Sequence, residues 1–162
     1  MFAAVLLLSV AQAILPARFA DSELSRHLTS AAEELLRIEK KAAAEQQGLD
    51  ALLYEDVLSL LDMALRADPQ NLHAHALAAG ALLLKSYDGD SYDICTLLDA
   101  RAEAEFVTGH ASRAKGDDLA GARAVLHEIA LIPPDEIPDP LSSCDEEDER
   151  HFGSRSSPAK TR

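Results

Sequence analysis

Apolar residues recur every three to four positions along most of the chain, which is the period of an α-helix with one buried face. The first such segment covers 21–47, and Gly48 follows it as a stop signal. A second helix is predicted over 49–67, where Asp68-Pro69 ends it because proline cannot continue a helix. The recurring apolar positions of these segments are Leu24, Leu28, Ala31, Ala32, Leu35, Leu36, Ile38, Leu53, Val57, Leu60, Leu61, Ala64 and Leu65.

The third predicted helix follows Asn71, whose side chain is a suitable N-cap, and runs through Leu84. Alanine and leucine fill nearly every position from 74 to 84, so this helix has almost no polar face. A helix without a polar face is expected at the centre of the molecule, where neighbours cover all of its sides.

A cluster of turn-forming residues at 86–93 separates the third helix from a fourth, which is predicted over 92–113. Gly116 and the two aspartates after it mark the end of one helix and the start of the next. The fifth helix is predicted to run to Leu131, and Pro133-Pro134 closes it.

Composition supports an all-α fold. The 29 alanines and 26 leucines make up about a third of the chain, aromatic residues are 4% and tryptophan is absent, so helix formers far outnumber strand formers. We therefore predict one domain over 21–134 with five main helices, and we exclude a sandwich or barrel. Its predicted core is Leu35, Leu53, Val57, Leu61, Leu65, Leu77, Leu98, Phe106, Val125 and Ile129.

The first twenty residues form a separate apolar segment. Residues 2–10 are apolar except for Ser9, and Ala11-Gln12-Ala13 has the small-x-small form of a signal-peptidase site. This favours cleavage and an exported, periplasmic or secreted protein. No Lys or Arg precedes the run, which leaves an alternative open: a retained apolar helix that packs on the first hairpin, or on a second copy to make a homodimer, in a cytoplasmic protein. The run is too short for a permanent membrane span.

Charge limits the kinds of partner. The chain has 28 acidic and 15 basic residues, a formal charge of −13 and a pI near 4.7. No segment clusters the Lys and Arg that a phosphate backbone needs, so we predict no nucleic-acid binding. The last segment, 135–162, holds prolines, the acidic run 145–149 and a basic, serine-rich end, and we predict that it is disordered. The two cysteines, Cys95 and Cys144, leave the redox compartment open.

No linear motif for catalysis, a cofactor or a metal is present, since GxSxG, P-loop, GxGxxG, HExxH and CxxC patterns are all missing. His73 and His75 are two positions apart, which on a helix directs them about 200° apart rather than at one metal. A calcium loop that starts at Asp88 would need glycine at its sixth position, where Asp93 stands. We therefore predict no enzyme activity, no cofactor and no metal.

Two segments resemble tetratricopeptide repeats. Val57, Leu61, Ala64 and Leu65 followed by Asp68-Pro69 look like the second helix of one repeat. Residues 102–133 look like another, and its matching positions are Gly109, Gly116, Gly121, Val125 and Pro133. From Pro69 to Pro133 is 64 positions, or two steps of 32, where the family has 34. The middle unit, 70–101, departs from the pattern because Gly80 is displaced by one position.

The resemblance covers 49–134 and implies antiparallel helical hairpins stacked as a short solenoid. An ordinary helical bundle is the alternative. In a bundle, helices that are distant in sequence contact one another, whereas in a solenoid they have almost no contacts. In the repeat family the first helix of each unit lines a concave groove. Here that surface would be formed by Leu77, Ala81, Leu84, Phe106, His110 and Arg113.

The predicted function is a non-catalytic protein–protein interaction module that binds a peptide or helix of a partner protein on this concave surface. Two alternatives stay open. An acidic helical-repeat protein of this size also resembles the cytoplasmic chaperones of type III secretion translocators, which hold an unfolded segment in the groove. The second alternative is an uncharacterised enzyme of the cell envelope. It stays open because acid–base residues that come together only in the folded protein form no sequence motif.

Overall fold

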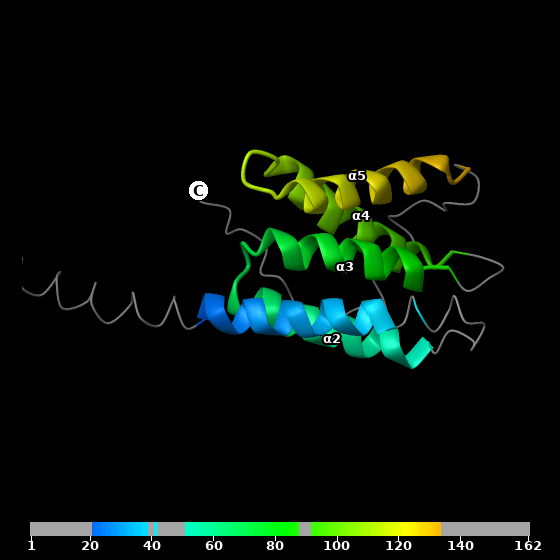
Figure 1. Cartoon of the computed structure of the whole chain (residues 1–162). Coiled ribbons are helices and arrows are strands. Elements are labelled where there is room, and N and C mark those ends of the chain that lie inside the picture. The colour runs from blue at the N-terminus through cyan, green and yellow to red at the C-terminus, as the bar shows by residue number, and fades with distance from the viewer. Residues whose placement is uncertain (1–20, 39–40, 42–50, 88–91, 134–162) are drawn as a thin grey trace, which may run out of the picture.

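A computed structural model describes residues 21–38, 41, 51–87 and 92–133 of the chain (Figure 1). Within these ranges there are five helices and no strand, so the all-α prediction is confirmed. The N-terminal helix covers 21–38, and Tyr87 and Tyr92 form an isolated bridge. The other helices are α2 (Ala51–Ala67), α3 (Leu72–Lys85), α4 (Ile94–Gly109) and α5 (Gly116–Leu131).

Local sequence signals decide where the helices begin and end. Asn71 is the N-cap of α3 as predicted, and its side chain accepts a hydrogen bond from the Ala74 amide at 3.2 Å. Asp93 caps α4 in the same way through the Cys95 amide at 3.1 Å, so α4 begins at Ile94. α4 ends at Gly109, earlier than the predicted Arg113, because residues 110–113 form turns.

α3 lies at the centre of the described helices. It contacts α2, α4 and α5, whereas α2 has no backbone contact with α4 or α5. Asn71 at its start also bonds to Ser25 and Thr29 of the N-terminal helix. Its alanines explain this position, because small side chains allow several neighbours to approach closely. Ala74, Ala78, Ala79 and Ala81 are all at most 1% exposed.

The N-terminal helix, α3 and α5 run in the same direction and begin at the same end of the molecule (Figure 1). In that view the N-terminal helix and α2 form one layer, α3 lies in the middle, and α4 and α5 lie beyond it. Three helix N-termini from distant parts of the sequence therefore meet at one end.

The observed core contains half of the predicted core residues. Val57, Leu61, Leu65, Val125 and Ile129 are buried. Leu35, Leu77, Leu98 and Phe106 are only half-buried, and the side chain of Leu53 lies outside the described set. Alanines of α3 and α4 fill much of the remaining interior.

Two sequence predictions concern residues outside the described ranges: the apolar segment 1–20 with its signal-peptidase site, and the disordered tail 135–162. Export and tail disorder therefore stay predictions. Among the helices that are described, none has the length and apolar character needed to cross a membrane.

Candidate binding site

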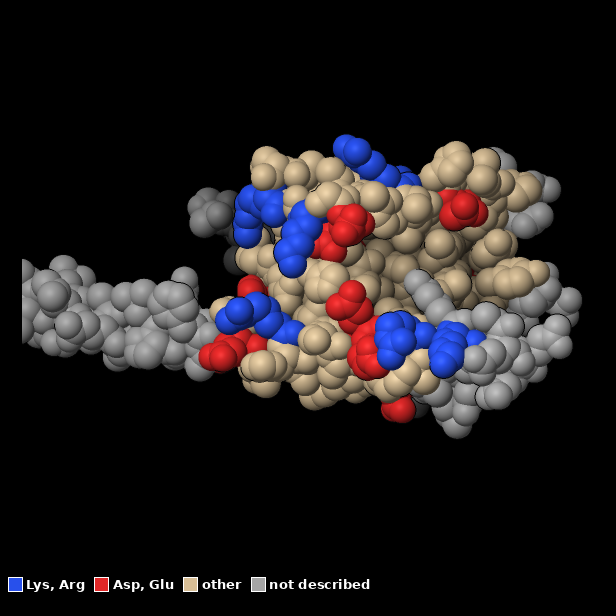
Figure 2. All heavy atoms as spheres, in the orientation of Figure 1, with Lys and Arg blue, Asp and Glu red and all other residues tan. Residues whose placement is uncertain are grey.

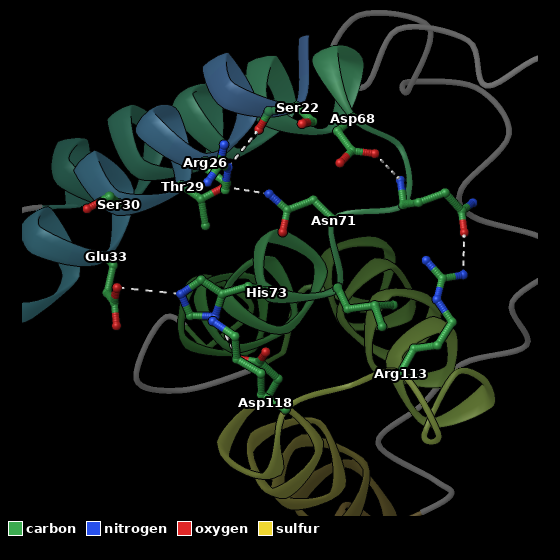
Figure 3. Close-up of a pocket in the computed structure, with 13 residues that line it drawn as sticks. Ser22, Arg26, Thr29, Ser30, Glu33, Asp68, Asn71, His73, Arg113 and Asp118 are labelled. Carbon is green, nitrogen blue, oxygen red and sulfur yellow. Dashed lines mark hydrogen bonds and ion pairs between the residues drawn. The ribbon is translucent and has the colours of Figure 1, made fainter. Parts of the chain in front are cut away.

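A cavity of about 520 Å³ opens where the three parallel helices begin (Figure 3). Its walls come from the first turns of the N-terminal helix, from the turn between α2 and α3 with the start of α3, and from the segment that leads into α5. Most of the lining side chains are polar or charged. They are Ser22, Arg26, Thr29, Ser30, Glu33, Asp68, Gln70, Asn71, Leu72, His73, Arg113, Lys115 and Asp118.

Asn71 joins two walls of this cavity. Its side-chain oxygen caps α3, while its Nδ2 donates to Ser25 Oγ at 2.9 Å and to Thr29 Oγ1 at 3.0 Å. Thr29 in turn donates to the Ser25 carbonyl at 2.7 Å. One amide therefore both starts α3 and fixes the N-terminal helix against it, and the residues that it binds are buried.

His73 connects all three parallel helices. Its Nδ1 lies 2.6 Å from Asp118 Oδ1 of α5, and its Nε2 lies 3.5 Å from Glu33 Oε2 of the N-terminal helix (Figure 3). Asp118 is 7% exposed, so this contact lies deep in the cavity wall. Because the imidazole contacts a carboxylate of α5 and one of the N-terminal helix, it helps to hold these two helices at their observed distances from α3.

Three basic side chains around the cavity form no ion pair with any described residue: Arg26, Arg113 and Lys115. Arg26 Nε donates to the Ser22 carbonyl and Arg113 Nη1 donates to Gln70 Oε1, both at a long 3.4 Å. Elsewhere on the described surface Arg37, Arg66, Lys85 and Arg101 each bind a carboxylate at 2.5–2.8 Å. Among the residues that the structure describes, the cavity therefore holds three basic side chains that no carboxylate neutralises.

Figure 2 shows the face that carries the cavity. Basic side chains lie above and below the hollow at the end where the helices begin, acidic side chains lie beside them there, and further acidic side chains lie nearer the middle of the face. The rest of the hollow is lined mainly by uncharged residues. The face thus carries basic and acidic side chains together around the hollow.

A second cavity of about 510 Å³ continues along the N-terminal helix and α3. It shares Ser30 and Glu33 with the first cavity, so the two are adjacent, and together we call them the groove. Leu77 of α3 and Arg37 of the N-terminal helix line it as well. Arg37 hydrogen-bonds to Glu34 at 2.5 and 2.8 Å, and this bond lowers the pKa of the Glu34 carboxyl from its usual 4.5.

The six sequence-predicted surface residues do not form one surface. Leu77 and Arg113 line the groove, at its second and first cavity respectively. Leu84 is 46% exposed at the far end of α3, whereas Ala81 is fully buried and cannot present a surface. Phe106 and His110 belong to α4 and the turn after it, where their rings stack with centroids 4.5 Å apart.

Phe106 also stacks on a buried pair between α3 and α4. Its ring centroid lies 4.0 Å from that of His75, which is 3% exposed. His75 Nδ1 bonds to Glu103 Oε2 of α4, and its Nε2 bonds to the Pro69 carbonyl at 3.1 Å. His73 and His75 therefore face different neighbours, and no group of three or more metal-binding side chains occurs among the described residues.

Sequence reasoning missed the residues that define the basic end, Arg26 and Lys115, and the polar link through Asn71 and His73. Asn71 was identified as a cap, but nothing in its local sequence signals its bonds to residues 42 and 46 positions earlier.

No family model, curated protein or solved structure matches the chain. Any function therefore has to be argued from the groove itself.

Proposed function

We propose that the chain is a non-catalytic protein–protein interaction module that binds an extended or helical segment of a partner protein in the groove between the N-terminal helix and α3. The observation that carries this proposal is the set of three unpaired basic side chains, Arg26, Arg113 and Lys115, around one end of a preformed groove. The proposal includes the arrangement of the five helices as stacked hairpins of a short repeat solenoid.

The contacts between helices support a stacked arrangement. α3 contacts the helices next to it and α5, two helices later, but α2 has no backbone contact with α4 or α5. In a solenoid each hairpin contacts only its neighbours, so such a pattern is expected. The N-terminal helix and α3 would then be the first helices of the first two units, and the groove would lie on their shared concave face.

The charges in the groove indicate which side chains a partner segment should carry. A guanidinium or ammonium group with spare donors binds a carboxylate through short, charge-assisted hydrogen bonds. Further along the groove, Leu77 offers apolar area between Glu34 and Arg37 of the opposite wall. The partner segment should therefore carry acidic side chains at one end and an apolar side chain about one or two helical turns away.

A displayed library of random peptides, selected on the full chain, tests this proposal. We expect the selected sequences to be enriched in Asp and Glu next to an apolar residue. The triple variant Arg26→Glu, Arg113→Glu, Lys115→Glu should weaken their binding at least tenfold, because three attractive charges become repulsive.

Arg123→Glu is the matched control. Arg123 is an exposed arginine of α5 that does not line the cavity, and it forms no ion pair with a described residue. Its reversal should leave the affinity within about twofold. Selected peptides that are apolar and lack acids would instead favour the chaperone-like holdase, and equal losses in the triple variant and the control would contradict the proposed groove.

A further inference from the structure

A disulfide attaches the C-terminal segment of the chain to the start of α4. Cys95 lies in the first turn of α4 and is disulfide-bonded. Cys144 is the only other cysteine of the chain, so it is the partner. The segment that follows α5 is therefore attached to the helices at two points: at Pro133, where it leaves α5, and at Cys95.

Both attachment points lie at the same end of the molecule, opposite the cavity (Figure 1). α4 and α5 contact each other and are joined by the short connection 110–115, so they run in opposite directions and α4 begins near the end of α5. The axes of packed helices are about 8–10 Å apart, which sets the gap between the two points. The eleven steps from Pro133 to Cys144 can span about 36–40 Å. Residues 134–143 thus have length to spare for crossing this end of the helices.

Exposed apolar side chains lie at the same end. Tyr87 and Tyr92 form a bridge just before α4, close to Cys95, and their ring centroids are 5.1 Å apart. Tyr87 is 51% exposed. Leu84 and Leu131, near the ends of α3 and α5, are exposed as well. Apolar area is therefore open beside the path of 134–143.

The ten residues between the two attachment points are rich in proline. They read Pro-Asp-Glu-Ile-Pro-Asp-Pro-Leu-Ser-Ser. Prolines favour the polyproline II conformation, which is extended and has no internal hydrogen bonds. Proline-rich segments in this conformation dock on surfaces lined by aromatic side chains. Ile137 and Leu141 add two large apolar side chains, so the segment suits an exposed tyrosine pair.

We propose that residues 134–143 form a strap that packs on Tyr87 and Tyr92 and is held there by the disulfide between Cys95 and Cys144. The strap lies at the opposite end of the helices from the cavity, so the inference does not depend on the proposed function. The disorder predicted for the tail is then confined to the residues after Cys144. Disulfides persist in oxidising compartments, so the strap is stable where an exported chain would fold.

Peptide mapping without reductant tests the attachment. Trypsin releases Cys95 in peptide 86–101 and Cys144 in peptide 124–150. We expect mass spectrometry to find these two peptides linked, in a chain that runs as a monomer on a gel without reductant. Free thiols, or a link that joins two copies of the chain, overturn the inference.

NMR relaxation of the oxidised full chain tests the packing. The backbone amides of 135–143 should have order parameters of about 0.85, as in a rigid helix, and reduction of the disulfide should lower them below about 0.6. Nuclear Overhauser effects should connect the ring protons of Tyr87 or Tyr92 to the prolines, Ile137 or Leu141. Order parameters below about 0.6 while the disulfide is intact overturn the inference.

Two variants separate docking on the tyrosines from the attachment itself. Tyr87→Ser removes an exposed ring but keeps both cysteines, so the order parameters of the strap should fall as they do on reduction. The double variant Ile137→Ser, Leu141→Ser changes only the strap and should lower them in the same way. Leu24→Ser is the matched control, because Leu24 is 52% exposed on the N-terminal helix, and the strap should stay rigid in it.

Two outcomes of this comparison overturn the inference. One is a strap that stays rigid in both test variants, since something other than the tyrosine pair would then hold it. The other is a set of Tyr87 ring signals that shift with protein concentration, since a second copy of the chain would then cover the ring.

Discussion

The buried pair of His75 and Glu103 should be the most sensitive polar contact in the fold. Its two side chains are 4% and 6% exposed, and it connects the central helix α3 to α4. The Pro69 carbonyl can only accept a hydrogen bond, so His75 Nε2 carries a hydrogen. The remaining nitrogen, Nδ1, hydrogen-bonds to the Glu103 carboxyl.

Removing one member leaves the other buried without its partner. Glu103→Leu has a similar volume but offers no polar atom, so the buried Nδ1 of His75 loses its hydrogen-bond partner and the free energy of unfolding falls by about 2–3 kcal/mol. Glu103→Gln still donates an amide hydrogen to Nδ1 of a neutral imidazole, so its loss should be about 1 kcal/mol. The whole free energy of unfolding of a domain of this size is about 5–15 kcal/mol, so the difference between the Leu and Gln variants is large enough to measure.

Urea denaturation of the full chain, followed by circular dichroism at 222 nm, measures these losses. The double variant His75→Phe, Glu103→Leu should recover part of the stability that Glu103→Leu loses, because no unpaired imidazole nitrogen is then buried and Phe can still stack on Phe106. A loss below about 1 kcal/mol for Glu103→Leu, or equal losses for Leu and Gln, would refute this reasoning.

Other predictions follow from single contacts. Asn71→Ala should lower the free energy of unfolding by about 2–4 kcal/mol in urea, since it removes a cap and two hydrogen bonds, and a loss below about 0.5 kcal/mol would contradict this. An NMR titration should place the pKa of Glu34 below 4.5, and Arg37→Gln should raise it. The Glu34 carboxylate therefore adds stability above its unfolded-state pKa, and this is lost as the pH falls through its folded-state pKa. Ala79→Leu should destabilise α3 by about 1–3 kcal/mol through overpacking, whereas Gly80→Ala, whose added Cβ meets no atom within 4 Å, should stabilise it by about 1 kcal/mol in the same assay.

The helices were predictable because their signals are local. Asp68-Pro69 ends α2, Asn71 begins α3, and the Ala-rich and Leu-rich stretch after it identifies the central helix. Boundaries were less accurate: α4 begins at Ile94, after its cap Asp93, two residues later than expected, and the turns after Gly109 shorten it. At such positions the capping residue and the apolar periodicity favour different helix ends. Here α4 begins where its capping residue places it.

The candidate site was not predictable, because it depends on packing between distant segments. Arg26 and Arg113 are 87 positions apart and meet only because the three parallel helices begin at one end. Ala81 was expected on the groove, but the register of α3 turns it into the core. Phe106 was expected on the same surface, yet it stacks between His75 and His110.

The central claim is that the groove binds a partner segment. It is tested most directly by backbone amide chemical shifts of the full chain during titration with a peptide selected from the library. The account predicts that the shifted amides cluster at residues 22–37, 70–77 and 113–118. Shifts confined to the outer faces of α2 and α4, around Met63, Arg66 and Arg101, would contradict it.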